Sequence, residues 1–162
     1  VALLVFNHQM RMMNLLTRLG WEARVLEHDG RPAAAGLNEV VTEVVDYMLF
    51  IDEAPLEGVR GTSGFAERFS AQGPRDGKGR SLRDLDLQRR LFRYPCSYMI
   101  YSDAFGALPD SARDALYARL WQILSGRDSS PKYARLSTAD RQAILEILRD
   151  TKKGLPLARP DL

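Results

Sequence analysis

The residues with the clearest capacity for chemistry lie in NHQMRMMNLLTRL, residues 7–19, which contains one of the two histidines and three of the five methionines. Imidazole and thioether groups are ligands for copper(I) and for haem iron. His8 and Met12 are one helical turn apart on the same face, so they can share a small ion but cannot ligate opposite faces of one haem. His28 lies roughly 30 Å further along a straight helix and cannot join them. A methionine-rich core with a hydrogen-bonded histidine explains the same pattern, and the sequence leaves both interpretations open.

A polar row follows the other side of this predicted helix. Arg11, Asn14 and Arg18, with Asn7, place donors at similar steps, and such donors suit carboxylates, phosphates or haem propionates. A solvated polar face with an Arg18–Glu22 pair one turn apart explains the row equally well. Both interpretations remain open from the sequence.

Other motifs point away from catalysis and from nucleotide binding. GPRDGKGRS, residues 73–81, has three residues between Gly73 and Gly77, and Gly79 stands where a phosphate-binding loop needs Ser or Thr. It therefore predicts a turn-rich linker. Two histidines, one cysteine and scattered carboxylates form no specific catalytic set, and Cys96 is most simply a small buried hydrophobe. Enzymatic activity stays undecided, with a non-catalytic role favoured.

Charge and composition bound the class of protein. The 162 residues are 45% hydrophobic with a net charge of +2, which is typical of one globular domain. Residues 75–93 hold seven basic and three acidic side chains, but the aromatic residues follow the charges instead of interleaving with them, so nucleic-acid binding is not expected. The longest apolar run, residues 1–6, is far too short to span a membrane. One cysteine excludes an internal disulfide and a CxxCH haem-attachment motif.

The elements that position these residues are predicted to be helices. Apolar periodicity and capping signals indicate helices over residues 2–28, 38–51, 65–71, 84–93, 110–126 and 137–153, with a further turn or two after Pro95, through Tyr101. A strand is the minority alternative for residues 38–51, which are rich in valine. We expect an all-α, irregular bundle of five to seven helices with a long Gly/Pro-rich loop. Within a single domain, residues 1–162, it would comprise a helical hairpin at 1–51, a loop at 52–83, a helical part at 84–154 and a tail at 155–162.

Four stretches carry a family resemblance: VALLVFNHQMRMMNLLTRLGWEAR, then the segment from APLEGVRG to YSDAF, then ARLWQILSGRD, and finally LSTADRQAILEILRDTKKGLP. Together they resemble the C-terminal portion of an uncharacterised family of exported, planctomycete-type bacterial proteins similar to cytochromes c. Residues 80–105 are the most distinctive part. The chain opens at Val1 inside an apolar helical pattern without an N-cap, so we expect it to be a C-terminal fragment of a longer protein.

The resemblance implies a non-catalytic helical segment of a periplasmic electron-transfer protein, with haem c attached in the missing N-terminal part. That part and a redox protein would be its partners, His8 would be a distal ligand, and Arg11, Asn14 and Arg18 would contact propionates. A haem-facing His8 should lie beside a cavity or an exposed apolar patch. The alternatives are a cofactor-free structural or protein-interaction domain and, more weakly, a copper(I) site at His8 and Met12.

Overall fold

A computed structural model describes residues 1–32 and 36–155 of the chain, and in that part the predicted all-α fold is confirmed. No β-strand occurs among the described residues, although Leu85 and Phe92 form a single isolated antiparallel β-bridge. The helices are α1 (Ala2–His28), α3 (Asn38–Met48), α4 (Phe65–Ala71), α5 (Asp103–Gly106), α6 (Asp110–Leu124) and α7 (Thr138–Thr151), with short 3₁₀ helices η1 (Tyr98–Tyr101) and η2 (Pro131–Tyr133).

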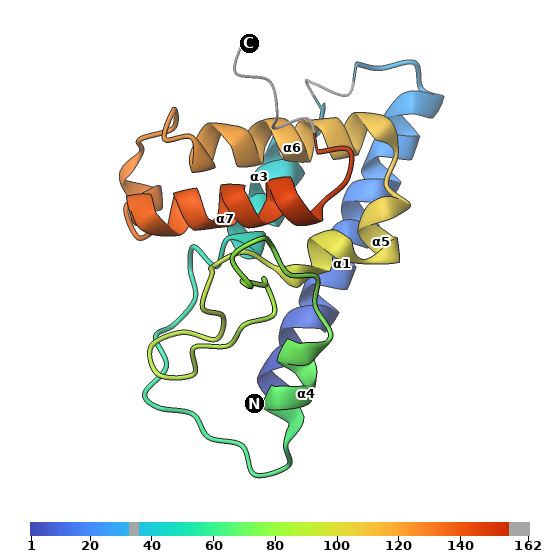
Figure 1. Cartoon of the computed structure of the whole chain (residues 1–162). Helices are drawn as coiled ribbons and strands as arrows, with labels where there is room; N and C mark the ends of the chain where they lie inside the picture. The colour runs from blue at the N-terminus through green and yellow to red at the C-terminus, as the bar shows by residue number, and fades with distance from the viewer. Residues whose placement is uncertain (33–35, 156–162) are drawn as a thin grey trace.

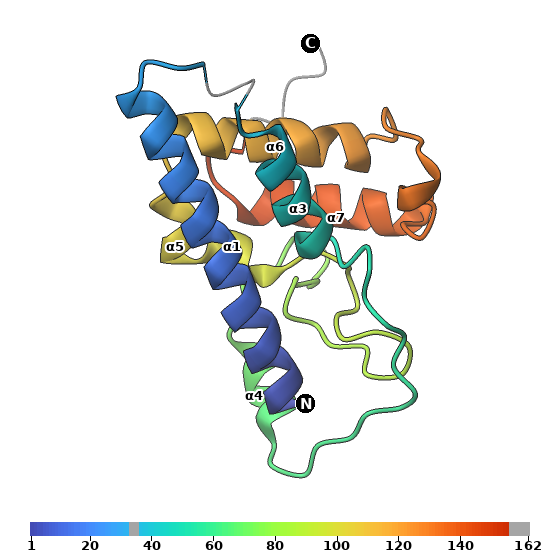
Figure 2. The same ribbon diagram turned by 180° about the vertical axis from the view of Figure 1, so that it is seen from behind.

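The helices form two groups that share one core. α6 and α7 lie side by side and run in opposite directions, while α1 crosses them steeply and α3 packs against both α1 and α6 (Figures 1 and 2). The connections after α3 and α4 run beside the N-terminal half of α1, with α4 next to the start of that helix (Figure 1). Burial of apolar side chains from every long helix stabilises this arrangement. Fully buried core residues include Met12, Leu16, Leu19, Val44, Leu116, Leu120 and Ile147.

Local signals set most helix ends as the sequence predicted. The Ser137 hydroxyl accepts the Asp140 backbone N–H at 3.0 Å and caps α7. α1 ends at His28, where Gly30 has a φ of 63° and the Arg31 N–H donates to the carbonyl of Leu26 at 2.9 Å. These two features define a Schellman motif, in which glycine is the usual residue with positive φ.

α3 ends in the same motif, but with phenylalanine at the glycine position. The Ile51 N–H donates to Asp46 O at 3.0 Å, the Phe50 N–H donates to Tyr47 O at 3.2 Å, and Phe50 has a φ of 55°. The helix therefore stops at Met48, and the predicted extent of residues 38–51 is three residues too long. Side-chain periodicity cannot register this stop, because a phenylalanine gives no local signal for left-handed backbone.

The helix predicted for residues 84–93 is wrong, since this segment folds back as a tight turn. The Asp86 carboxylate accepts backbone N–H groups two and three residues later at 3.0 and 3.1 Å, and Leu87 has a φ of 62°. The Arg93 N–H donates to Asp84 O at 2.8 Å across the turn. Asp86 thus offers the backbone a turn in place of a helix. The helical part, predicted to span residues 84–154, therefore begins only at Tyr98. Of the predicted tail, residues 156–162 lie outside the described residues.

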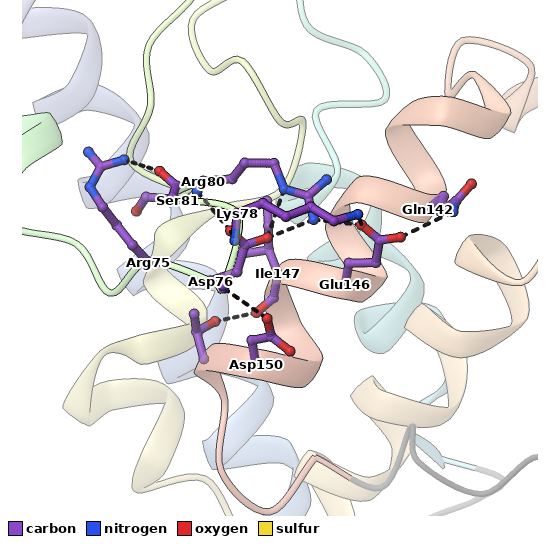
Figure 3. Close-up of polar contacts among 12 residues, drawn as sticks. Arg75, Asp76, Lys78, Arg80, Ser81, Gln142, Glu146, Ile147 and Asp150 are labelled. Carbon is purple, nitrogen blue, oxygen red and sulfur yellow. Dashed lines mark hydrogen bonds and ion pairs between the residues drawn. The ribbon is translucent and has the colours of Figure 1, made fainter.

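Charged side chains hold the Gly-rich linker, residues 73–81, against α7 (Figure 3). Asp76 is buried and accepts backbone N–H groups of Lys78 and Arg80 at 2.9 and 2.8 Å. The Arg80 guanidinium bridges Asp76 and Glu146, each at 2.6 Å, and Lys78 reaches Glu146 at 2.8 Å. Hydrogen bonds from Lys78 and Arg80 lower the pKa of Glu146 to about 2. Internal pairing uses these cations, so they form no free basic surface.

Membrane insertion was not expected from the sequence. None of the helices in the described part of the chain has the length and apolar character needed to cross a bilayer.

Candidate functional site

A cavity of about 920 Å³ lies where the N-terminal half of α1, α3 and the chain after α3 meet. α1 contributes Asn7, His8 and Arg11 to its wall, and Tyr47 and Phe50 come from the end of α3 and the turn that follows. This size is within the range of pockets that bind small molecules or cofactors. The cavity is therefore the candidate functional site.

His8 forms part of the aromatic wall. Its imidazole stacks on Tyr47, with ring centroids 5.1 Å apart, and on Phe50 at 4.6 Å. The side chain is only 4% exposed, and burial lowers its pKa from 6.5 to about 4. The ring is consequently neutral at neutral pH, a state in which one of its nitrogens can accept a hydrogen bond or ligate a metal.

Ser97 fixes the orientation of His8. The His8 Nε2 atom and the Ser97 hydroxyl oxygen are 2.7 Å apart, and that oxygen also accepts the Met99 backbone N–H at 3.2 Å. The Ser97 N–H in turn donates to Met48 O at 2.8 Å, which ties the serine to the end of α3. The other ring nitrogen, Nδ1, has no hydrogen-bond partner in the described part of the chain. Nδ1 is thus the ring nitrogen that the described residues leave without a hydrogen bond.

The His8–Ser97 pair resembles the base and nucleophile of a hydrolase, but its burial opposes that role. Ser97 is fully buried, so its hydroxyl cannot reach a substrate in this conformation. Cys96 is also fully buried, and burial raises the pKa of its thiol to about 12, which disfavours the reactive thiolate. The geometry around His8 thus suits binding better than covalent catalysis.

Carboxylates dominate the charge of the cavity wall. Glu43 is paired with Arg18 at 2.8 Å, and Asp46 is paired with Lys132. The other carboxylates of the wall have no ion pair among the described residues; they are Glu39, Asp52 and Glu53. Burial raises the pKa of Glu53, and this effect outweighs the backbone N–H of Leu91 and two nearby arginines. A weakly hydrated carboxylate of this kind gains from a positively charged partner.

The cavity wall contains two cations, Lys132 and Arg11. Lys132 pairs with Asp46, whereas Arg11 has no ion pair with a carboxylate of the described residues. Its guanidinium carbon lies 4.7 Å from the centroid of the Tyr47 ring, a cation–π geometry. The side chain is exposed to solvent. Tyr47 therefore already contacts a positive group at the edge of the cavity.

The structure brings together only part of the predicted site. His8 and Arg11 line the cavity, so the expectation of a cavity beside His8 is met. Arg18 lies outside the cavity wall and pairs with Glu22 at 2.7 Å, the one-turn contact expected for a solvated face, and Asn14 is exposed and does not line the cavity. Met12 is completely buried one turn from His8. Roles of these residues toward haem or copper(I) stay predictions.

Several groups of the site lie beyond what the sequence predicts. Phe50 belongs to a helical pattern, Asp52 and Glu53 count among scattered carboxylates, and the sequence assigns no role to Tyr47 or Ser97. The available signal was the interleaving of acidic and aromatic residues in DYMLFIDE, residues 46–53, at a helix end. No group of three or more His, Cys, Asp or Glu side chains placed to hold a metal occurs in the part that the structure describes.

No protein-family model matches the chain, and no curated protein or solved structure matches it either. The resemblance to cytochrome-c-like proteins therefore still depends on the sequence stretches alone.

Proposed function

We propose that this helical domain binds a small organic molecule in the cavity beside His8. The observation that carries the proposal is a cavity of about 920 Å³ whose wall combines aromatic faces with a few fixed polar groups. Such a combination is typical of ligand sites, where apolar contact provides affinity and polar groups provide orientation. His8 supports orientation, because Ser97 holds its ring while Nδ1 has no internal partner in the described residues.

The side chains around His8 support binding of a ligand without covalent catalysis. Two possible nucleophiles, Ser97 in contact with His8 and its neighbour in sequence Cys96, are both fully buried. Neither can approach a ligand without rearrangement of η1 and the chain before it. A binding domain places no such demand on them.

A neutral fluorescent probe tests this proposal. N-phenyl-1-naphthylamine should bind the cavity with an increase in fluorescence, and Thr42→Trp, which fills the cavity from α3, should weaken that binding about tenfold or more. Thr17→Trp is the matched control: each hydroxyl donates to the carbonyl four residues earlier, at 2.7 Å for Thr42 and 2.9 Å for Thr17, but Thr17 lies outside the cavity wall. Circular dichroism would confirm that both variants fold.

Two results would contradict the proposal. Absence of probe binding by the unmodified protein is one. Equal binding by Thr42→Trp and Thr17→Trp is the other, since it would place the probe elsewhere on the surface.

A haem-facing surface in an exported cytochrome-c-like electron-transfer protein is a second candidate function. One observation favours it: a neutral imidazole, whose Nδ1 has no hydrogen bond to the described residues, lines the cavity together with Asn7 and Arg11. The carboxylates of the wall that have no ion pair oppose it, because they would repel haem propionates. Titration with haemin, followed in the Soret band, should show retention that His8→Ala reduces. Equal retention by His8→Ala and the unmodified protein would remove His8 from any haem site.

A further inference from the structure

We infer that the ligand of the His8 cavity is an organic cation, with an ammonium or methylated ammonium group attached to an apolar portion. The inference rests on the proposed function, because it assigns a chemical class to the molecule that this cavity would bind. Two independent features of the wall support it, namely its excess of carboxylates over cations and the identity of its aromatic faces.

The charge of the wall is opposite to that of the whole protein. The chain has a formal net charge of +2, yet the wall holds five carboxylates against the two cations Arg11 and Lys132. Arg18 pairs with one of these carboxylates from outside the wall, and Arg90 and Arg135 lie near another, Glu53. Carboxylates still outnumber the cations that line the cavity. Like charges gathered around one cavity raise the local concentration of ions of the opposite sign. An anionic ligand would meet repulsion from the same groups, so charge favours a cation.

The aromatic faces add a contact that a cation can use and an anion cannot. Tyr47 and Phe50 both line the cavity and both stack on His8. The negative faces of aromatic rings attract ammonium groups, most strongly where the contact excludes water. Arg11 over Tyr47 at 4.7 Å shows that a positive group fits against this ring within the folded protein.

Arg11 has a second consequence for binding. Its guanidinium competes with a ligand cation for the Tyr47 face and also reduces the negative charge of the wall. Removal of Arg11 should therefore strengthen the binding of a cation. The same substitution should weaken the binding of an anion, including a haem propionate, so its sign separates the two classes of ligand.

Displacement of N-phenyl-1-naphthylamine provides the test. Benzyltrimethylammonium, its uncharged carbon analogue neopentylbenzene, and the anion phenylacetate would be compared as competitors. We expect the cation to displace the probe at a concentration about tenfold lower than the carbon analogue, and phenylacetate to displace it poorly. Because the two main competitors share one shape, the difference between them reports charge.

Variants locate the effect within the cavity. Glu53→Gln and Glu39→Gln should each weaken binding of the cation by roughly threefold, and Arg11→Ala should strengthen it by a similar factor. Glu67→Gln, at an exposed position on α4 outside the cavity wall, should leave binding unchanged. Neopentylbenzene affinity should not respond to these charge changes.

The outcomes separate the inference from the proposed function. Probe binding with displacement by neopentylbenzene or phenylacetate as effective as by the cation would overturn the inference and leave a binding cavity. Weaker cation binding in Arg11→Ala would also overturn it. If the probe does not bind, the proposed function fails and the inference fails with it.

Discussion

The Phe50 ring stacks on the His8 imidazole, with centroids 4.6 Å apart and planes inclined by 27°. Phe50 reaches this position with a φ of 55°, in the left-handed region that favours glycine. The equivalent positions after α1 and α6 are Gly30 and Gly126, with φ values of 63° and 78°. A non-glycine residue in this region stores backbone strain, and strain of this kind is often found at binding and active sites.

Substitution of Phe50 by glycine should separate stability from binding. Relief of the positive φ contributes about 1 kcal/mol, which offsets much of the lost packing of a half-buried ring, so we expect the free energy of unfolding to change by less than about 1 kcal/mol. Binding of N-phenyl-1-naphthylamine should fall several-fold because the wall loses an aromatic face. Urea unfolding and fluorescence titration measure the two effects.

Phe92→Ala is the control for this comparison. Phe92 is 1% exposed, contacts both His8 and Phe50, and has no positive φ, so its truncation should destabilise the fold by about 3–5 kcal/mol. A similar destabilisation by Phe50→Gly would show that the ring of Phe50 is chiefly a core residue.

The burial of His8 should make stability depend on pH. Its pKa is about 4 in the folded protein and about 6.5 when unfolded, so between these values the unfolded state binds the extra proton. Stability therefore falls as the pH falls through this window, and we expect a loss of about 2 kcal/mol between pH 7 and pH 5 from His8 alone. Urea unfolding at the two pH values measures this loss.

The second histidine supplies the matched variant. His8→Gln should remove the pH-dependent component, whereas His28→Gln, at an exposed position at the end of α1, should retain it. Comparison of each variant with the unmodified protein cancels the titration of all other groups. The same pH dependence in His8→Gln would mean that another group causes it.

Glu146 should control how firmly the Gly-rich linker is held on α7. Because Lys78 and Arg80 lower its pKa from 4.5 to about 2, its contribution is present above pH 4.5 and is lost as the pH falls toward 2. Glu146→Gln should accelerate trypsin cleavage after Lys78 and Arg80 several-fold at neutral pH. Mass spectrometry of the early fragments measures the rate at each bond.

Dissolved salt screens ion pairs, so the dependence of cleavage on salt concentration tests the same contacts independently. High salt should accelerate cleavage of the linker in the unmodified protein more than in Glu146→Gln, because the variant has already lost the two ion pairs to Glu146 and retains only the one between Arg80 and Asp76. Glu67→Gln, which has no ion pair in the described part of the chain, should be cleaved like the unmodified protein. Unchanged cleavage in Glu146→Gln would indicate that Asp76 and backbone hydrogen bonds are sufficient to hold the linker.

The sequence alone determined where most helices lie. Apolar spacing predicted α1 over residues 2–28 and α4 over residues 65–71, and both agree with the structure, as does the Ser137 cap of α7. These features depend on side chains within one or two turns of each other. The all-α class follows from the same local signals.

Distant contacts decided what the sequence could not. In residues 84–93 the turn is stabilised from another segment, because the N–H groups of Leu56 and Val59 donate to the carbonyls of Arg89 and Leu87 at 2.9 and 2.7 Å. Helical spacing in a single segment does not contain that information. The hydrogen bonds from residues 56 and 59 therefore add to the local Asp86 turn and outweigh the helical spacing of the segment.

The candidate site shows the same division. The sequence placed His8 on the apolar face of a helix, and it identified Arg11 as a donor on the polar face. Only the fold set His8 against Ser97, 89 residues away, and against Tyr47 and Phe50. Only the fold gathered Glu39, Asp52 and Glu53 around one cavity without an ion pair among the described residues. Helix formation depends on neighbours along the chain, whereas burial, stacking and net local charge depend on which segments pack together.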